Sequence, residues 1–131
     1  METKNRDYKF LRVIIGTIAR IYYAPKIINK KVIPESGPII VAGNHRHATD
    51  QYLAGISTKR VLRYMAKREY FDGTQSLFGN PTKPSKLGCK VSKFIVETAG
   101  CIRVDRDIKD VTASEQALEV LKQGGAVGIF P

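Results

Sequence analysis

A histidine and an aspartate five residues apart, His45 and Asp50, are the side chains of this chain best suited to proton-transfer chemistry. Neutral imidazole accepts a proton near neutral pH, and a carboxylate bonded to its other ring nitrogen fixes the tautomer and stabilises the imidazolium that forms. We therefore predict that His45 is a general base and that Asp50 orients it. The spacing alone leaves a second interpretation open, in which His45 is an ordinary loop residue and Asp50 is the N-cap of a helix.

The pair follows an apolar run, residues 38–43, that is typical of a buried strand ending in a turn. Three further runs have the same character: residues 61–66, 101–104 and 126–130. Helical patterns separate the runs, and this alternation predicts an α/β fold with a mixed, largely parallel sheet flanked by helices. Ligand sites form where the carboxyl ends of parallel strands meet, so we expect the pair to lie at such an edge.

Two cations are expected at the same edge of the sheet. Lys67 follows the second predicted strand, Arg106 follows the third, and Pro131 follows the fourth. A base and acid pair beside two cations favours proton abstraction next to a bound anion, and a phosphate ester is the obvious anion. For either cation alone, a solvated surface charge is the alternative interpretation.

The first part of the chain, residues 1–31, is predicted to be a basic, membrane-associating amphipathic segment. Between residues 8 and 23, apolar side chains recur at helical spacing. The opposite stripe is predicted to hold Lys9, Arg12, Gly16 and Arg20. The apolar part is too short to cross about 30 Å of hydrocarbon, so we expect the helix to lie on a membrane surface. A helix packed on the domain is the alternative interpretation.

The formal net charge of +10 favours anionic partners such as nucleic acid, a phospholipid surface or a phosphorylated metabolite. The basic residues are spread along the chain and do not alternate with aromatic residues, so we expect no nucleic-acid partner. Cys89 and Cys101 lack the spacing of a metal site or a redox pair. We therefore expect two reduced core cysteines and no bound metal.

Four short motifs resemble those of the glycerolipid acyltransferases, most closely the bacterial lysophosphatidic acid acyltransferases. In chain order they are Asn44-His45 with Asp50, Lys67-Arg68-Glu69, the stretch from Gly100 to Arg106, and Phe130-Pro131. The second is similar to the family's Lys-x-Glu, the third to its Gly, hydrophobic residues and Arg, and the fourth to the start of its Phe-Pro-Glu-Gly-Thr-Arg. Each motif is loose alone, but their order and spacing match over nearly everything from Pro34 onward.

The resemblance implies an enzyme that moves a fatty acyl group to the free hydroxyl of lysophosphatidic acid, giving phosphatidic acid in phospholipid biosynthesis. The co-substrate would be acyl-CoA or acyl-ACP, with no bound cofactor. His45 would be the general base, oriented by Asp50, and no nucleophile of the enzyme would be required. His47 departs from the family pattern, and we expect it not to be catalytic.

The same resemblance implies the remaining roles and partners. Lys67 and Arg106 would hold the substrate phosphate. The supporting motif residues would be Asn44, Gly100, Phe130 and Pro131. The partners would be a membrane phospholipid surface, the lysophospholipid substrate and, where the donor is acyl-ACP, acyl carrier protein. The protein would lie on the cytoplasmic face of the cell membrane as a peripheral or monotopic protein.

Residues 32–131 are interpreted as the N-terminal part of the acyltransferase α/β domain, because the last motif is present only as Phe130-Pro131. The sheet is therefore expected to be incomplete, with an exposed edge at residues 126–130. The alternative from another functional class is a non-catalytic peripheral membrane protein that binds anionic lipid through its basic helix.

Overall fold

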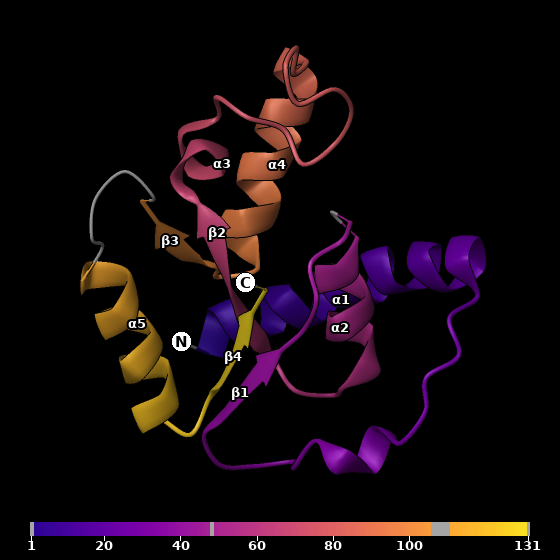
Figure 1. The fold of residues 1–131 in the computed structure, drawn as a ribbon, viewed down its shortest axis with the longest axis vertical. Helices are drawn as coiled ribbons and strands as arrows, with labels where there is room; N and C mark the ends of the chain where they lie inside the picture. Colours follow the sequence, from indigo (N-terminus) through magenta and orange to yellow (C-terminus); the bar gives the residue numbers. More distant parts are fainter. Residues whose placement is uncertain (1, 48, 106–110, 131) are drawn as a thin grey trace.

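The fold is built on one four-stranded sheet (Figure 1). A computed structural model describes residues 2–47, 49–105 and 111–130. The strands are β1 (Ile39–Ala42), β2 (Leu62–Lys67), β3 (Ile102–Val104) and β4 (Ala126–Ile129). They lie in the order β1-β4-β2-β3, and every neighbouring pair is parallel. The prediction of an α/β fold with a largely parallel sheet is confirmed.

The predicted exposed edge at residues 126–130 is wrong. β4 lies between β1 and β2, so the edges of the sheet are β1 and β3. The burial of β4 is that of a central strand, because Ala126 and Val127 are each only 1% exposed. Gly128 has no side chain, and the ring of Tyr64 occupies the space that a Cβ would need. Chain order did not show that the last strand inserts between earlier ones.

Helices cover both faces of the sheet. They are α1 (Glu2–Tyr23), α2 (Asp50–Ser57), α3 (Arg68–Asp72), α4 (Lys86–Thr98) and α5 (Val111–Lys122), with a 3-10 turn η1 (Lys30–Val32). α5 packs on one face, where Ala113 and Ala117 join Val127 in a buried cluster. α1, α2 and α4 gather on the other face (Figure 1), where residues of all three helices line a cavity together with Tyr64. The predicted division of the chain between residues 31 and 32 falls within η1 and stays a prediction.

α1 packs against α2 and α4 through Tyr8, Leu11 and Ile15, but it leaves a second set of large apolar side chains exposed. The packed side carries Gly16, where an added Cβ would stand 2.8 Å from the Ile56 side chain. Phe10 is 69% exposed and Ile18 is 63% exposed. The predicted polar stripe is therefore wrong for Gly16 and Arg12, which face the domain. Small residues allow close helix contact, and this outweighs the simple preference for burying the largest apolar face.

No helix among the described residues has the length and apolar character needed to span a bilayer.

Candidate active site

The loop after β1 carries His45 to within ionic range of Asp50. Gly43 extends the strand pairing by one step, because its N–H donates to the Ile129 carbonyl at 3.1 Å. His45 follows two residues later, with its Nδ1 3.7 Å from the Asp50 Oδ2. The imidazole remains 37% exposed, whereas the carboxylate is 23% exposed. The predicted base and acid therefore meet, at an ion-pair separation that is longer than a hydrogen bond.

The Asp50 carboxylate also organises the loop in front of it. Its Oδ2 accepts hydrogen bonds from the backbone N–H of Arg46 at 2.7 Å and of His47 at 2.8 Å. The amide of His47 contributes most to holding the pKa of Asp50 below its ordinary value of 3.8, and the Arg46 amide and the His45 imidazole add to it. The carboxylate is therefore ionised at neutral pH, and an anion beside His45 stabilises an imidazolium.

The alternative interpretation of Asp50 as an N-cap is wrong by one residue. Thr49 occupies the N-cap position of α2, and Asp50 is the first helical residue. An N-cap side chain bonds amides further along its own helix, whereas Asp50 bonds amides that precede it in the loop. A negative charge in the first turn also interacts favourably with the helix dipole.

The ring of Phe130 packs beside the His45 imidazole, a contact that the sequence did not predict. The Phe130 ring lies with its centroid 5.7 Å from that of His45 and 5.9 Å from that of Tyr64. Gly43 makes room for this ring, since a Cβ there would come within 3.0 Å of it. The Phe in the last motif therefore supports the imidazole from the neighbouring strand end, and Gly43 is the sequence signal that a close approach occurs here.

Lys67 also lies at the carboxyl end of its strand, but it does not contact the His45–Asp50 pair. Ile39 and Leu62 both pair with Ala126, so counting along the strands places Lys67 level with Asn44. β4 separates β1 from β2, which makes the strands roughly 10 Å apart. Side chains alternate along a strand, so Lys67 belongs to the face of β2 that carries Met65 and packs on α5.

The structure describes two of the four remaining predicted site residues. Arg106 and Pro131 lie outside the described residues. Asn44 is exposed in the loop before His45. Gly100 lies between α4 and β3, where it has a φ of +62° and contacts the Arg63 guanidinium. Its role is in the backbone turn, because a Cβ at this position would collide with that guanidinium.

A comparison with protein-family models decides the broad identity. A family model described as Acyltransferase matches residues 24–131. The chain belongs to this acyltransferase family. Searches of curated proteins and of solved structures found no match.

Family membership agrees with the motif resemblance at the level of acyl transfer. The acyltransferase match begins at Ala24, directly after α1, and it contains His45, Asp50 and Lys67. Members of this family are enzymes that transfer acyl groups, so a catalytic role for the chain follows from the match. No group of three or more His, Cys, Asp or Glu side chains suited to a metal ion occurs in the part of the acyltransferase that the structure describes.

An ion-pair network joins α3 to the end of β3 in this acyltransferase. Arg68 Nη1 lies 2.6 Å from the Asp105 Oδ2, and Arg68 Nε lies 3.3 Å from the Asp72 Oδ2. Arg103 Nη2 adds a contact of 3.3 Å to Asp72. The middle residue of the Lys-Arg-Glu motif therefore fixes the strand end that leads to Arg106. The four-residue spacing of Arg68 and Asp72 was the available sequence signal for part of this network.

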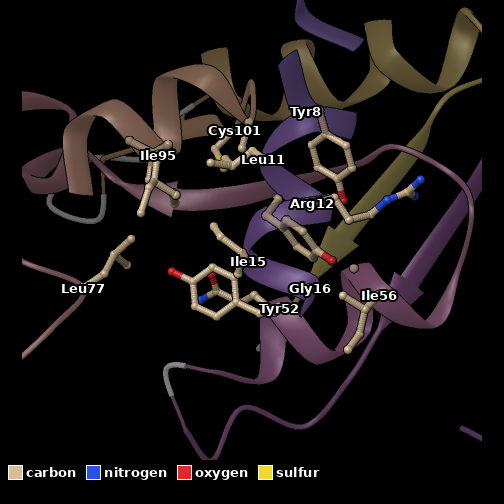
Figure 2. Close-up of a pocket in the computed structure, with 16 residues that line it drawn as sticks. Tyr8, Leu11, Arg12, Ile15, Gly16, Tyr52, Ile56, Leu77, Ile95 and Cys101 are labelled. Carbon is tan, nitrogen blue, oxygen red and sulfur yellow. The ribbon is translucent and has the colours of Figure 1, made fainter. Parts of the chain in front are cut away.

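An apolar cavity of about 70 Å³ lies between β2 and the helices α1, α2 and α4. Figure 2 shows Ile15, Tyr52 and Ile95 around it, one from each helix. Tyr64 also lines the cavity, and its ring contacts Phe130, which in turn contacts the histidine. Two aromatic rings in succession, Tyr64 and Phe130, therefore lie between the cavity and the candidate base.

The cavity is unsuited to charged groups. Burial raises the pKa of the Cys101 thiol to about 12, and burial likewise raises the pKa of Tyr52 to about 12. Both side chains are therefore protonated at neutral pH, and Cys101 is no nucleophile. The wall of the cavity favours an apolar occupant, because it offers little to compensate a desolvated charge.

Proposed function

We propose that this acyltransferase transfers a fatty acyl group from acyl-CoA or acyl-ACP to the free hydroxyl of lysophosphatidic acid, forming phosphatidic acid. The observation that carries the proposal is the His45–Asp50 pair at the carboxyl edge of the sheet, with 3.7 Å between the Nδ1 and the Oδ2. Family membership supports acyl transfer in general. The motifs at the carboxyl ends of the strands support our choice of acceptor, donor and product.

In the proposed reaction, His45 removes the proton from the acceptor hydroxyl as its oxygen attacks the thioester carbonyl. The carbon–sulfur bond then breaks as the new ester forms. The departing thiolate takes the proton from the imidazolium, so the base is regenerated and the free thiol leaves. The thioester has a good leaving group, so positioning the two substrates can replace a covalent intermediate.

Asp50 would stabilise the imidazolium that exists between the two proton transfers. Its carboxylate is held by two backbone amides, which leaves it ionised and fixed in direction. A distance of 3.7 Å in the absence of substrate is compatible with this role, because catalytic hydrogen bonds commonly shorten when substrate binds.

Lys67 and Arg106 would hold the substrate phosphate. Lys67 supplies a point charge on a flexible stem at the edge of the sheet. Arg106 is the next residue after Asp105, which Arg68 holds at the end of β3. Arginine can grip a phosphate with two parallel hydrogen bonds, so this residue would set the orientation of the headgroup.

The apolar surfaces of the molecule fit the lipid nature of both substrates. The cavity beside Tyr64 would receive part of the donor's acyl chain, since it is apolar and is connected to His45 through the Tyr64 and Phe130 rings. The outward face of α1, with Phe10 and Ile18, would contact the membrane that supplies the acceptor. We place the protein on the cytoplasmic face of the cell membrane, where acyl thioesters are available.

The test of the catalytic role compares two neighbouring histidines. The full-length protein is mixed with lysophosphatidic acid and an acyl thioester, and release of the thiol is followed for wild type, His45→Asn and His47→Asn. We expect the His45 variant to lose between about 10² and 10⁴ in rate, the usual contribution of a general base. The His47 variant should stay within a few-fold of wild type. Equal rates for wild type and His45→Asn would remove His45 from catalysis.

A further inference from the structure

A basic groove of about 1130 Å³ lies at the amino ends of the strands, whereas the candidate active site lies at their carboxyl ends. Its lining includes Val61, which precedes β2, and Ala126, the first residue of β4, so it opens at the amino ends of the strands. The other walls are α1 and the connection from α1 to β1, which runs as a wide arc in Figure 1. The reaction proposed above does not use this groove.

Two arginines form the fixed part of the groove. Arg12 Nη1 donates to the carbonyls of Thr58 at 3.0 Å and Arg60 at 3.3 Å. Arg60 Nη2 donates to the carbonyls of Gly37 at 2.6 Å and Gly124 at 2.8 Å. These acceptors are neutral, so both guanidinium groups are held in place while their charges remain uncompensated.

Five more cations surround this fixed pair. They are Lys9, Arg20, Lys30, Lys31 and Lys59. Among the side chains that the structure describes, no carboxylate forms an ion pair with any of the five. Glu35 is the one acidic residue in the described lining. Seven cations facing one carboxylate produce a strongly positive potential in a concave surface, and this attracts an anionic ligand.

The adjoining surface of α1 indicates which anion fits. Val13 lines the groove and is 64% exposed, and it lies between Lys9 and Arg20 on the same side of the helix. Immediately beside this stripe lies the outward apolar face with Phe10 and Ile18. A ligand with a phosphate next to long apolar chains would satisfy both surfaces together, whereas free phosphate or nucleic acid would leave the apolar face in water.

We propose that this basic groove binds the headgroup of an anionic phospholipid, while the outward face of α1 contacts the acyl chains of the same leaflet. The inference rests on the membrane contact of the proposed function and not on acyl transfer. It assigns a second lipid site, remote from His45, that would orient the enzyme on an anionic membrane.

The experiment compares two triple variants of equal net charge. Arg20→Gln/Lys30→Gln/Lys31→Gln removes three exposed cations of the groove, and Lys86→Gln/Lys90→Gln/Lys122→Gln removes three exposed lysines elsewhere. Cosedimentation is measured with vesicles of phosphatidylcholine alone and of phosphatidylcholine mixed with phosphatidylglycerol. At about 1 kcal/mol per cation near the surface, the groove variant should bind the mixed vesicles roughly 100-fold more weakly than wild type. The control variant should lose less than tenfold.

The other arms separate this site from general adhesion and from other ligands. Binding to phosphatidylcholine vesicles should be equal for wild type and the groove variant, since it depends on the apolar face. An equal loss in both triple variants, or no preference of wild type for the mixed vesicles, would overturn the groove site alone. Absence of binding to either vesicle would overturn the membrane contact as well, whereas thiol release would still test acyl transfer.

Two competitors test the identity of the ligand. Inorganic phosphate, and separately a single-stranded DNA oligonucleotide, are added to wild type bound to mixed vesicles at constant ionic strength. We expect neither to release the protein beyond the effect of a matched chloride control. Release by phosphate would assign the groove to a free anion, and release by the oligonucleotide would assign it to nucleic acid. Either result would overturn the lipid assignment.

Discussion

Asp50 has two tasks at the level of single residues. It faces the His45 imidazole, and it holds the loop that carries this imidazole through the amides of Arg46 and His47. The spacing of the histidine and the aspartate predicted the first task, because a base and its carboxylate must lie close together. The second was not predictable from side-chain types, since it depends on the direction of two backbone N–H groups.

Replacing Asp50 by Asn should change how stability depends on pH. The lowered pKa means that the ionised carboxylate stabilises the folded state above the ordinary value of 3.8, and this contribution is lost as the pH falls through the lower folded value. We expect the variant to be about 1 kcal/mol less stable at neutral pH, the usual cost of losing such a capping interaction. The difference from wild type should shrink below pH 3.8. Urea unfolding at a series of pH values measures both.

Asp7→Asn is a suitable control for this pH series, because Asp7 pairs only loosely with Arg6 at 3.7 Å on the surface of α1. Its stability should follow that of wild type within about 0.5 kcal/mol at every pH. A constant difference between wild type and Asp50→Asn down to the lowest pH would show that the carboxylate charge does not stabilise the loop.

At the level of elements, hydrophobic patterns located the strands well and the contacts between elements poorly. The apolar runs at 38–43 and 126–130 became β1 and β4 within two residues at each end. The insertion of β4 between β1 and β2 depends on contacts far apart in the chain, which a local pattern does not contain. The packed side of α1 was not predictable for the same reason, because it is set by the contact between Gly16 and Ile56.

The turn between α4 and β3 shows how a motif glycine acts through the backbone. Gly100 N–H donates to the Glu97 carbonyl and Cys101 N–H donates to the Val96 carbonyl, at 3.1 and 3.0 Å. These bonds form a Schellman cap, which places a left-handed residue after the helix. A glycine directly after a helix is a common sequence signal for such a cap, but the sequence did not show that Arg63 fills the space beside Gly100.

Gly100→Ala should therefore destabilise the protein more than a glycine substitution in an open turn. The change adds a positive-φ cost of about 1 kcal/mol and a collision with the Arg63 guanidinium. We expect a total loss of about 2 to 3 kcal/mol in the free energy of unfolding, measured with urea. Gly79→Ala is the control, because its φ is +82° and nothing lies within 4 Å of the added Cβ. Equal losses would mean that the Arg63 contact has no energetic weight.

At the level of the whole molecule, the candidate catalytic pair and the basic groove lie at opposite ends of the strands of one sheet, and an apolar helix face lies beside the groove. His45 lies at the carboxyl ends of the strands, and the basic groove opens at the amino ends. The sequence predicted a basic amphipathic helix and a net charge of +10. The two alternatives for this helix were that it lies on a membrane or that it packs on the domain, and each would bury some apolar surface. The sequence did not predict that the helix would pack on the domain and still leave an apolar face exposed.

The exposed face of α1 makes a specific prediction for membrane binding. Ile18→Asp should weaken cosedimentation with phosphatidylcholine vesicles at least tenfold, because burying an isoleucine in lipid contributes roughly 1.5 to 3 kcal/mol and a carboxylate opposes insertion. The free energy of unfolding should change by less than about 0.5 kcal/mol, since Ile18 is 63% exposed. Leu118→Asp is the matched control, because Leu118 is 55% exposed on α5, the helix on the other face of the sheet. If both variants lost binding equally, the contact would be general hydrophobic adhesion. If neither did, α1 would not be the element that meets the membrane.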